Sequence, residues 1–206
     1  MSKIIIKPVY TLDSMLSAED RSNLWKRRAL EAQLALESDR LEDEDSIVVE
    51  DSIECSPKCT YLIDFKVWCD SQEVTRQIDY INGHCTGTSP NVTATAIQNY
   101  WINKLKWKSP GYHVLVHSDG SYTVFSDLQL VTNGVRGVNS RSINVSYTGG
   151  TVDGKNLDTR TKQQKATFNG IIKILSMKFP DAEILGHRDH KGVKKSCPCF
   201  NMKDEF

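Results

Sequence analysis

The chain has 206 residues, of which 39% are hydrophobic and 25% are charged. This is enough for one globular domain of ordinary size with an extension. No apolar run is long enough for a membrane-spanning helix, and the first seven residues have too short an apolar core for a secretory signal. We therefore expect synthesis in the cytoplasm without a signal peptide, so that export would need another route.

The formal charge is zero overall but is divided unevenly along the chain. Residues 1–79 hold 10 Lys and Arg against 17 Asp and Glu, whereas residues 80–206 hold 16 against 9. A basic C-terminal region would attract an anionic polymer over long range. Nucleic acid has that sign too, but the sequence contains no nucleic-acid recognition motif.

Residues 1–76 are interpreted as an N-terminal extension. Residues 1–10 are typical of a short strand, and residues 17–40 predict a helix because apolar residues recur along one face. The acidic run 42–45 indicates a solvated linker. The segment 59–69 is too apolar to stay in water, which favours docking of the extension on the catalytic region or on a protein partner. A mobile tail is the alternative.

From residue 77 onward, signals for strands and helices alternate. Strands are expected at 78–82, 112–116, 122–125, 142–147 and 184–185, and the turn residues 118–121 predict a hairpin. Helices are expected over 93–105 and from Thr161 to Lys178, where Thr161 and Gln164 match a capping box. The pattern predicts one α/β domain over residues 77–206, with a mixed central sheet flanked by helices.

Three candidate zinc ligands, His84, His187 and Cys197, lie where the chain is expected to leave a strand. Catalytic zinc takes three protein ligands and keeps a fourth position for water, whose pKa it lowers to about 7. The six cysteines lack the paired spacing of a zinc ribbon, and the missing export signal favours thiols or metal ligands over disulfides. His190 and Cys199 are alternative ligands.

Five short motifs occur in order between residues 78 and 202. They are His84-Cys85-Thr86-Gly87-Thr88, Gly111 to Val116 with its Asp119-Gly120 turn, Asn139 to Val145 followed by Gly149-Gly150, His187-Arg188-Asp189, and Lys195 to Phe200. In this order and spacing, the region resembles the zinc amidases of the phage-lysozyme and peptidoglycan-recognition-protein superfamily. The resemblance does not cover residues 1–76.

The resemblance implies roles for individual residues. His84, His187 and Cys197 match the family's metal ligands, while Tyr112 and Lys195 match its catalytic pair. Tyr112 would contact the attacking water or the tetrahedral intermediate, and Lys195 would stabilise the developing oxyanion. The sequence departs from the family at Asn144, where relatives commonly have glycine.

Other polar residues near these motifs have simpler interpretations. His113 should be structural or contact substrate, because it should point away from Tyr112 on a strand. His117 is expected to be solvated at the hairpin turn, and Cys85 to be a packed thiol. Arg188 and Asp189 should shape the loop after His187.

We therefore expect a zinc-dependent hydrolase that cuts the amide bond between N-acetylmuramic acid and L-alanine in bacterial peptidoglycan. The missing signal suggests a phage or prophage lysis enzyme, made in the host cytoplasm and released to the cell wall. A toxin delivered between bacteria or a wall-recycling enzyme would carry the same site. The alternative from another class is an inactive peptidoglycan-binding or virion-structural protein with an amidase fold.

Overall fold

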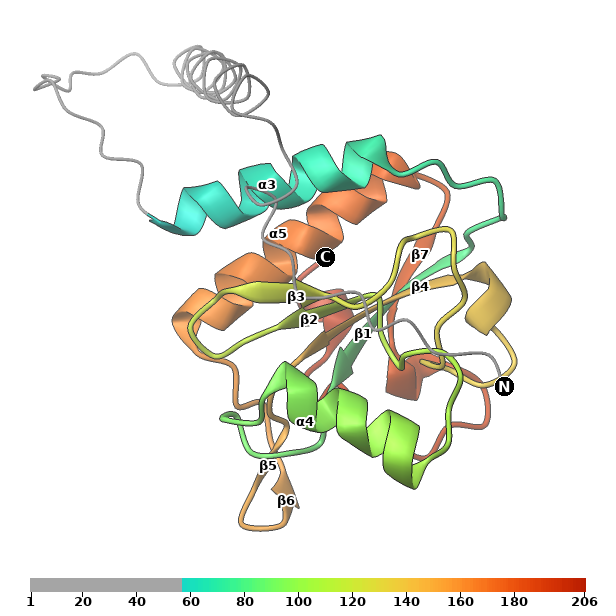
Figure 1. Cartoon of the computed structure of the whole chain (residues 1–206). Coiled ribbons are helices and arrows are strands. Elements are labelled where there is room, and N and C mark those ends of the chain that lie inside the picture. The colour runs from blue at the N-terminus through green and yellow to red at the C-terminus, as the bar shows by residue number, and fades with distance from the viewer. Residues whose placement is uncertain (1–56) are drawn as a thin grey trace, which may run out of the picture. The chain divides into compact units, whose positions relative to one another are not determined.

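Five strands form the central sheet in the order β3-β2-β4-β1-β7 (Figure 1). They are β1 (Tyr80–Cys85), β2 (Val114–Val116), β3 (Tyr122–Val124), β4 (Ser142–Tyr147) and β7 (Glu183–Gly186). β2, β4, β1 and β7 are parallel, and only β3 runs antiparallel, as the second strand of a hairpin with β2. The predicted mixed sheet flanked by helices is confirmed.

The computed structural model describes residues 57–206, with side chains from residue 61 onward. The strand expected at 1–10, the helix expected at 17–40 and the linker at 42–45 lie outside the described residues. Within residues 57–206, no helix is long and apolar enough to cross a membrane.

The two faces of the sheet differ sharply in polarity because side chains alternate along each strand. On β4, Ile143, Val145 and Tyr147 join the hydrophobic core. The residues between them, Asn144 and Ser146, are polar and yet fully buried. The same alternation on β1 places Cys85 in the core and His84 on the polar face. The alternation in the sequence thus gives the sheet one apolar face and one face with buried polar side chains.

Helix α5 (Lys162–Lys178) covers the apolar face. Thr161 caps it, accepting a hydrogen bond from the backbone N–H of Gln164 at 3.0 Å. The other half of the expected capping box is wrong. The Gln164 side chain is buried and donates instead to the carbonyls of Val116 and Thr148, both at 3.0 Å, at the ends of two strands. The Val116 carbonyl also accepts from the backbone N–H of Thr148 at 2.9 Å, so the Gln164 amide adds a second connection between the ends of β2 and β4.

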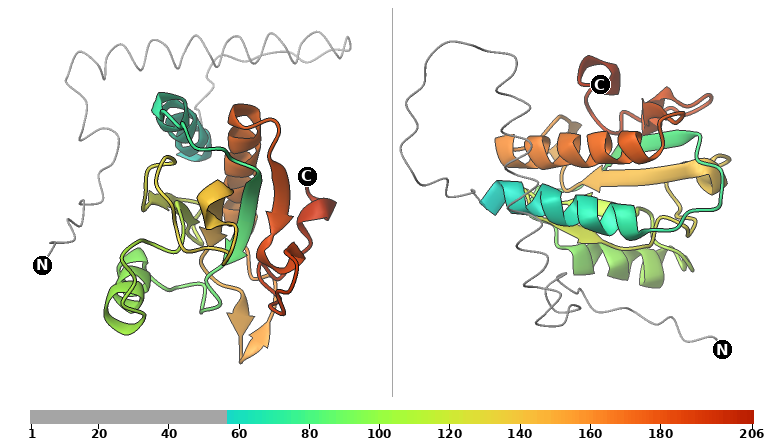
Figure 2. Two further views of the ribbon diagram at one scale, coloured as in Figure 1. Left: turned by 90° about the vertical axis from the view of Figure 1, so that its right-hand side faces the viewer. Right: turned by 90° about the horizontal axis from the view of Figure 1, so that it is seen from above.

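Helix α3 (Pro57–Ser71) lies beside α5 on the same face (Figure 2). Phe65 of α3 is completely buried in the core. A Cβ atom on Gly170 of α5 would lie 2.5 Å from the Leu62 side chain, so the glycine allows the two helices to approach closely. The apolar segment 59–69 therefore lies in a helix that packs on α5, and the compact unit spans Pro57–Phe206.

The opposite face is covered by α4 (Ala94–Asn99), which continues as a π-helical turn, Tyr100–Lys104. Thr93 caps the start of α4 through Ala96 N–H, as the position of the expected helix suggests. Trp101 and Ile97 pack on Leu115 of β2. The remaining elements are short: the hairpin β5 (Thr151–Val152) and β6 (Lys155–Asn156), and the 3-10 turns Asn139–Arg141, His187–Asp189 and Met202–Asp204.

Candidate functional site

His84, His187 and Cys197 come together at one end of the sheet. One ligand atom from each lies within 4.8 Å of the others. Sγ of Cys197 is 3.8 Å from Nδ1 of His84. Around a tetrahedral zinc ion, sulfur at about 2.3 Å and nitrogen at about 2.0 Å lie roughly 3.5 Å apart. The donor set and its spacing therefore fit a metal ion.

The sheet explains why the two histidines meet. β1 and β7 are parallel neighbours in which Gly83 pairs with Gly186. His84 and His187 are the next residues, so both follow paired positions at the same end of the sheet. Their ring centroids are 5.0 Å apart.

Cys197 is held by hydrogen bonds from both histidine segments. The backbone N–H of Arg188 donates to the carbonyl of Cys197 at 2.9 Å, and the backbone N–H of Cys85 points at its sulfur at 3.2 Å. Asp189 accepts a hydrogen bond from Gly186 N–H at 2.7 Å. As expected, Arg188 and Asp189 shape the loop that follows β7.

Burial keeps both histidines neutral. It lowers the pKa of His84 to about 4, with a further contribution from the charge of Lys195. Burial, the neighbouring His84 and Lys195 lower the pKa of His187 to about 4. The pKa of Cys197 is lowered by hydrogen bonds from Cys85, although burial opposes this. Neutral imidazole and thiolate are the forms that bind metals.

Tyr112 and Lys195 lie next to this group. The Tyr112 ring is 5.3 Å from that of His84, and its hydroxyl is 3.4 Å from the carbonyl of Cys85. Burial raises the pKa of Tyr112, so its hydroxyl stays protonated and can donate. Lys195 is exposed and close enough for its charge to act on both histidines.

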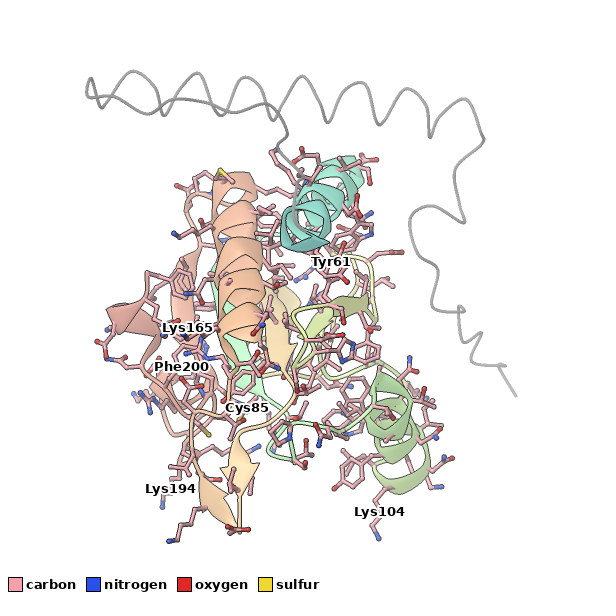
Figure 3. All side chains as sticks on the ribbon, turned by 90° about the vertical axis from the view of Figure 1, so that its left-hand side faces the viewer. Tyr61, Cys85, Lys104, Lys165, Lys194 and Phe200 are labelled. Atoms are coloured by element: carbon pink, nitrogen blue, oxygen red, sulfur yellow. The ribbon has the colours of Figure 1, made fainter. Side chains whose placement is uncertain are left out.

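The two alternative ligands lie elsewhere. Nε2 of His190 is 2.7 Å from Oδ1 of Asn82. Sγ of Cys199 is 3.6 Å from Sγ of Cys85, on the face of the sheet that α5 covers, where Figure 3 shows Cys85. Neither belongs to the three-residue group found among residues 57–206.

Two other histidines have structural contacts. His113 is fully buried and hydrogen-bonded to backbone groups of Asn144 and Leu130, which favours the structural interpretation. The expectation for His117 is wrong, because it is half-buried and Nε2 lies 2.8 Å from the Thr123 hydroxyl across the hairpin. Asn144, for which the sequence predicts no role, places its Oδ1 at 3.0 Å from Nε2 of His84.

Comparison with known proteins defines the class. The family described as N-acetylmuramoyl-L-alanine amidase matches residues 74–200. The endolysin of Enterobacteria phage K11 is 32% identical over 123 residues, which cover 58% of this chain and 80% of the relative. The endolysin of Escherichia phage T7 is 30% identical over 128 residues, covering 61% and 83%.

Solved structures show the same fold. An endolysin from the Thermus scotoductus bacteriophage Ph2119 aligns with a TM-score of 0.52 at 22% identity, covering 65% of this chain and 88% of that chain. Drosophila PGRP-LB aligns with a TM-score of 0.51 at 16% identity, covering 65% and 82%. The chain belongs to the N-acetylmuramoyl-L-alanine amidase family. It is therefore a hydrolase of the amide bond between N-acetylmuramic acid and L-alanine in peptidoglycan.

Proposed function

We propose that this amidase is zinc-dependent and that His84, His187 and Cys197 hold the metal. The observation that carries the proposal is the convergence of these two imidazoles and one thiol within 4.8 Å. Nitrogen and sulfur donors in this combination suit zinc. Zinc bound there would supply a Lewis acid and make water a nucleophile at neutral pH.

The chain's own residues would perform the remaining steps. Tyr112, protonated and beside His84, would donate a hydrogen bond to the oxygen that gains negative charge as the carbonyl is attacked. Lys195 would bring a positive charge to the same oxygen. Donors fixed in advance toward developing charge lower a barrier by several kcal/mol. Water would add its hydroxyl to the carbonyl carbon, and the proton that it loses would go to the nitrogen of L-alanine as the amide bond breaks.

We infer that the biological role is phage-encoded lysis of the bacterial cell wall. Two relatives at 30% identity or more are phage endolysins, and the structurally similar Drosophila PGRP-LB has been described with tracheal cytotoxin bound to a Tyr-to-Phe mutant. Synthesis in the host cytoplasm and release to the wall complete the hypothesis.

Mass spectrometry of digested peptidoglycan tests the proposal. Purified cell walls should yield stem peptides with a new free L-alanine amine and no new reducing sugar. A chelator should abolish cleavage, and added zinc should restore it. Intact walls that still sediment with the protein would instead support the inactive binding protein, and cleavage that resists metal removal would contradict zinc dependence.

A further inference from the structure

A series of buried polar side chains runs from His84 across the polar face of the sheet. Its members are His84, Asn144, Thr132 and His113, and Asn82 joins it through Nδ2, which donates to Oδ1 of Asn144 at 3.2 Å. None of the five is more than 1% exposed. Buried polar groups need partners, so each hydrogen bond must have a donor on one side and an acceptor on the other. This requirement determines which group donates and which accepts in each hydrogen bond of the series.

The direction is set by backbone groups at the His113 end. The backbone N–H of Asn144 lies 2.9 Å from Nδ1 of His113, and an N–H can only donate, so Nδ1 is an acceptor. The proton of the neutral ring is then on Nε2, which donates to the carbonyl of Leu130 at 3.0 Å. Nη2 of Arg76 is 3.4 Å from Nε2, but it donates to the nearer carbonyls of Leu128 and Ser142 at 2.8 and 2.9 Å. The Thr132 hydroxyl lies 3.2 Å from Nδ1 of His113, which carries no proton, so at this contact the hydroxyl can only donate, sharing the single lone pair of Nδ1 with the Asn144 N–H.

The direction continues through the Asn144 amide. Because the Thr132 hydroxyl uses its proton on His113, its oxygen accepts from Nδ2 of Asn144 at 2.9 Å. Oδ1 of Asn144 therefore faces His84, at 3.0 Å from Nε2. Nε2 must carry the ring proton and donate. The lone pair of His84 is then on Nδ1, the atom that lies 3.8 Å from Cys197 Sγ.

Space for the Asn144 amide comes from Gly134. A Cβ atom at position 134 would lie 2.2 Å from both Cγ and Oδ1 of Asn144, far inside contact distance. The chain thus combines a glycine at 134 with an amide at 144. The resemblance leads one to expect glycine at position 144, so this pair is a feature of this chain's own site.

We propose that Asn144 is a positioning residue that holds His84 with its Nδ1 lone pair directed at the metal position, and that Thr132 and His113 orient Asn144. Outer partners of metal-bound histidines fix the tautomer and the ring orientation. The inference deepens the proposed function, since it rests on His84 as a metal ligand.

Zinc affinity in full-length variants tests the proposal, measured by competition with a chromophoric chelator. Asn144→Ala should weaken zinc binding by roughly 10- to 100-fold. Asn144→Asp keeps an acceptor toward Nε2, and the Thr132 hydroxyl can turn its proton to the second carboxylate oxygen and still orient the side chain, so the affinity should stay within about threefold of that of the unmodified protein. Ser142→Ala removes another buried hydroxyl from the same face of β4, bonded to the Val138 carbonyl, and should leave the affinity unchanged.

A second measurement needs no metal. In the metal-free protein at pH 7, the Nε2 proton of His84 should be protected from exchange with water and give a ring N–H signal in NMR spectra. The signal should disappear in Asn144→Ala and persist in Asn144→Asp and Ser142→Ala. A merely structural role for Asn144 would not separate the alanine variant from the aspartate variant.

Two further variants keep the test decisive if Asn144→Ala does not fold. Thr132→Val preserves volume but removes the hydroxyl that orients the amide, and Gly134→Ala pushes Asn144 away from His84. Both should weaken zinc binding roughly tenfold. Undiminished affinity together with a retained ring N–H signal in these variants would overturn the inference. Absence of zinc binding by the unmodified protein would count against the proposed function instead, and the metal-free NMR measurement distinguishes the two failures.

Discussion

Sγ of Cys197 lies 3.8 Å from Nδ1 of His84, whereas Sγ of Cys199, only two residues later, has no such contact and lies 3.6 Å from Sγ of Cys85. The side chains of His84 and Cys85 point to opposite faces of β1, and Sγ of Cys197 also lies 3.2 Å from the backbone nitrogen of Cys85. Both thiols pack against the core, and of the two it is the Cys197 thiol that also faces His84 and His187.

The different contacts of the two thiols predict different outcomes for two matched substitutions. Cys197→Ser should lower zinc affinity by more than the roughly 10- to 100-fold that loss of an outer partner costs, because it removes a proposed ligand. Cys199→Ser should bind zinc within about threefold of the unmodified protein. Elemental analysis after dialysis gives the stoichiometry, and chelator competition gives the affinity. The reverse ranking would show that the ligand assignment is wrong.

Tyr112→Phe should retain fold and metal but lose roughly 100-fold in kcat/KM, because only the donating hydroxyl is removed. Tyr100→Phe is the control, since Tyr100 is 55% exposed on the π-helical turn. Turnover of a soluble muramyl peptide, with bound zinc measured on the same sample, checks both variants. Near-normal turnover in the zinc-loaded Tyr112 variant would exclude the catalytic role.

Lys195→Ala should also lose roughly 100-fold in kcat/KM, because a positive charge near the developing oxyanion is lost. Lys194→Ala removes the same charge one position earlier from another exposed lysine, seen at the edge of the molecule in Figure 3. It should change turnover less than about twofold. Equal losses in both variants would mean that general attraction to the polymer is being measured.

Phe65→Ala should destabilise the protein by about 3–5 kcal/mol, since it empties a fully buried site between α3 and the core. Lys66→Ala affects an exposed ion pair with Asp70 on the same helix and should cost less than about 1 kcal/mol. Urea unfolding of both variants measures the difference. A small effect at Phe65 would mean that α3 contributes little to the stability of the amidase unit.

The stability of the Phe65 and Lys66 variants is relevant to where the domain begins. The sequence placed the boundary at residues 76 and 77, the family match begins at residue 74, and the compact unit begins at Pro57. The apolar residues of segment 59–69 were sufficient to predict burial. Their partner was not predictable, because the close contact of Leu62 depends on Gly170, more than 100 positions later. The boundary at residue 77 as a unit of folding stays a prediction.

The sequence predicted an element best where residues within that element determine its limits. The alternation of apolar and polar residues predicted the limits of β4, and Thr161 as a cap predicted the start of α5. The family order of motifs led to the three candidate ligands. The role of Asn144 was not accessible, because it depends on the register in which β1 pairs with β4, and on the space left by Gly134. The prediction that the Gln164 side chain caps α5 was wrong, because a capping pattern does not reveal that this side chain is buried.

Acid should destabilise the metal-free protein in a defined window. Burial lowers the pKa of His84 to about 4 and that of His113 to about 3, from the ordinary 6.5. Between pH 6.5 and pH 4 the unfolded chain therefore takes up protons that the folded protein does not bind, so the unfolding free energy falls as pH falls. The stabilisation that comes from keeping these histidines neutral should be fully present above pH 6.5. Each pH unit below that should lower the unfolding free energy by roughly 1.4 kcal/mol for each of the two histidines. Urea unfolding at several pH values in the presence of a chelator measures the slope, and NMR titration should show both rings neutral at pH 5.5. An unfolding free energy that stays constant from pH 7 to pH 4.5 would mean that these histidines are not held neutral by burial.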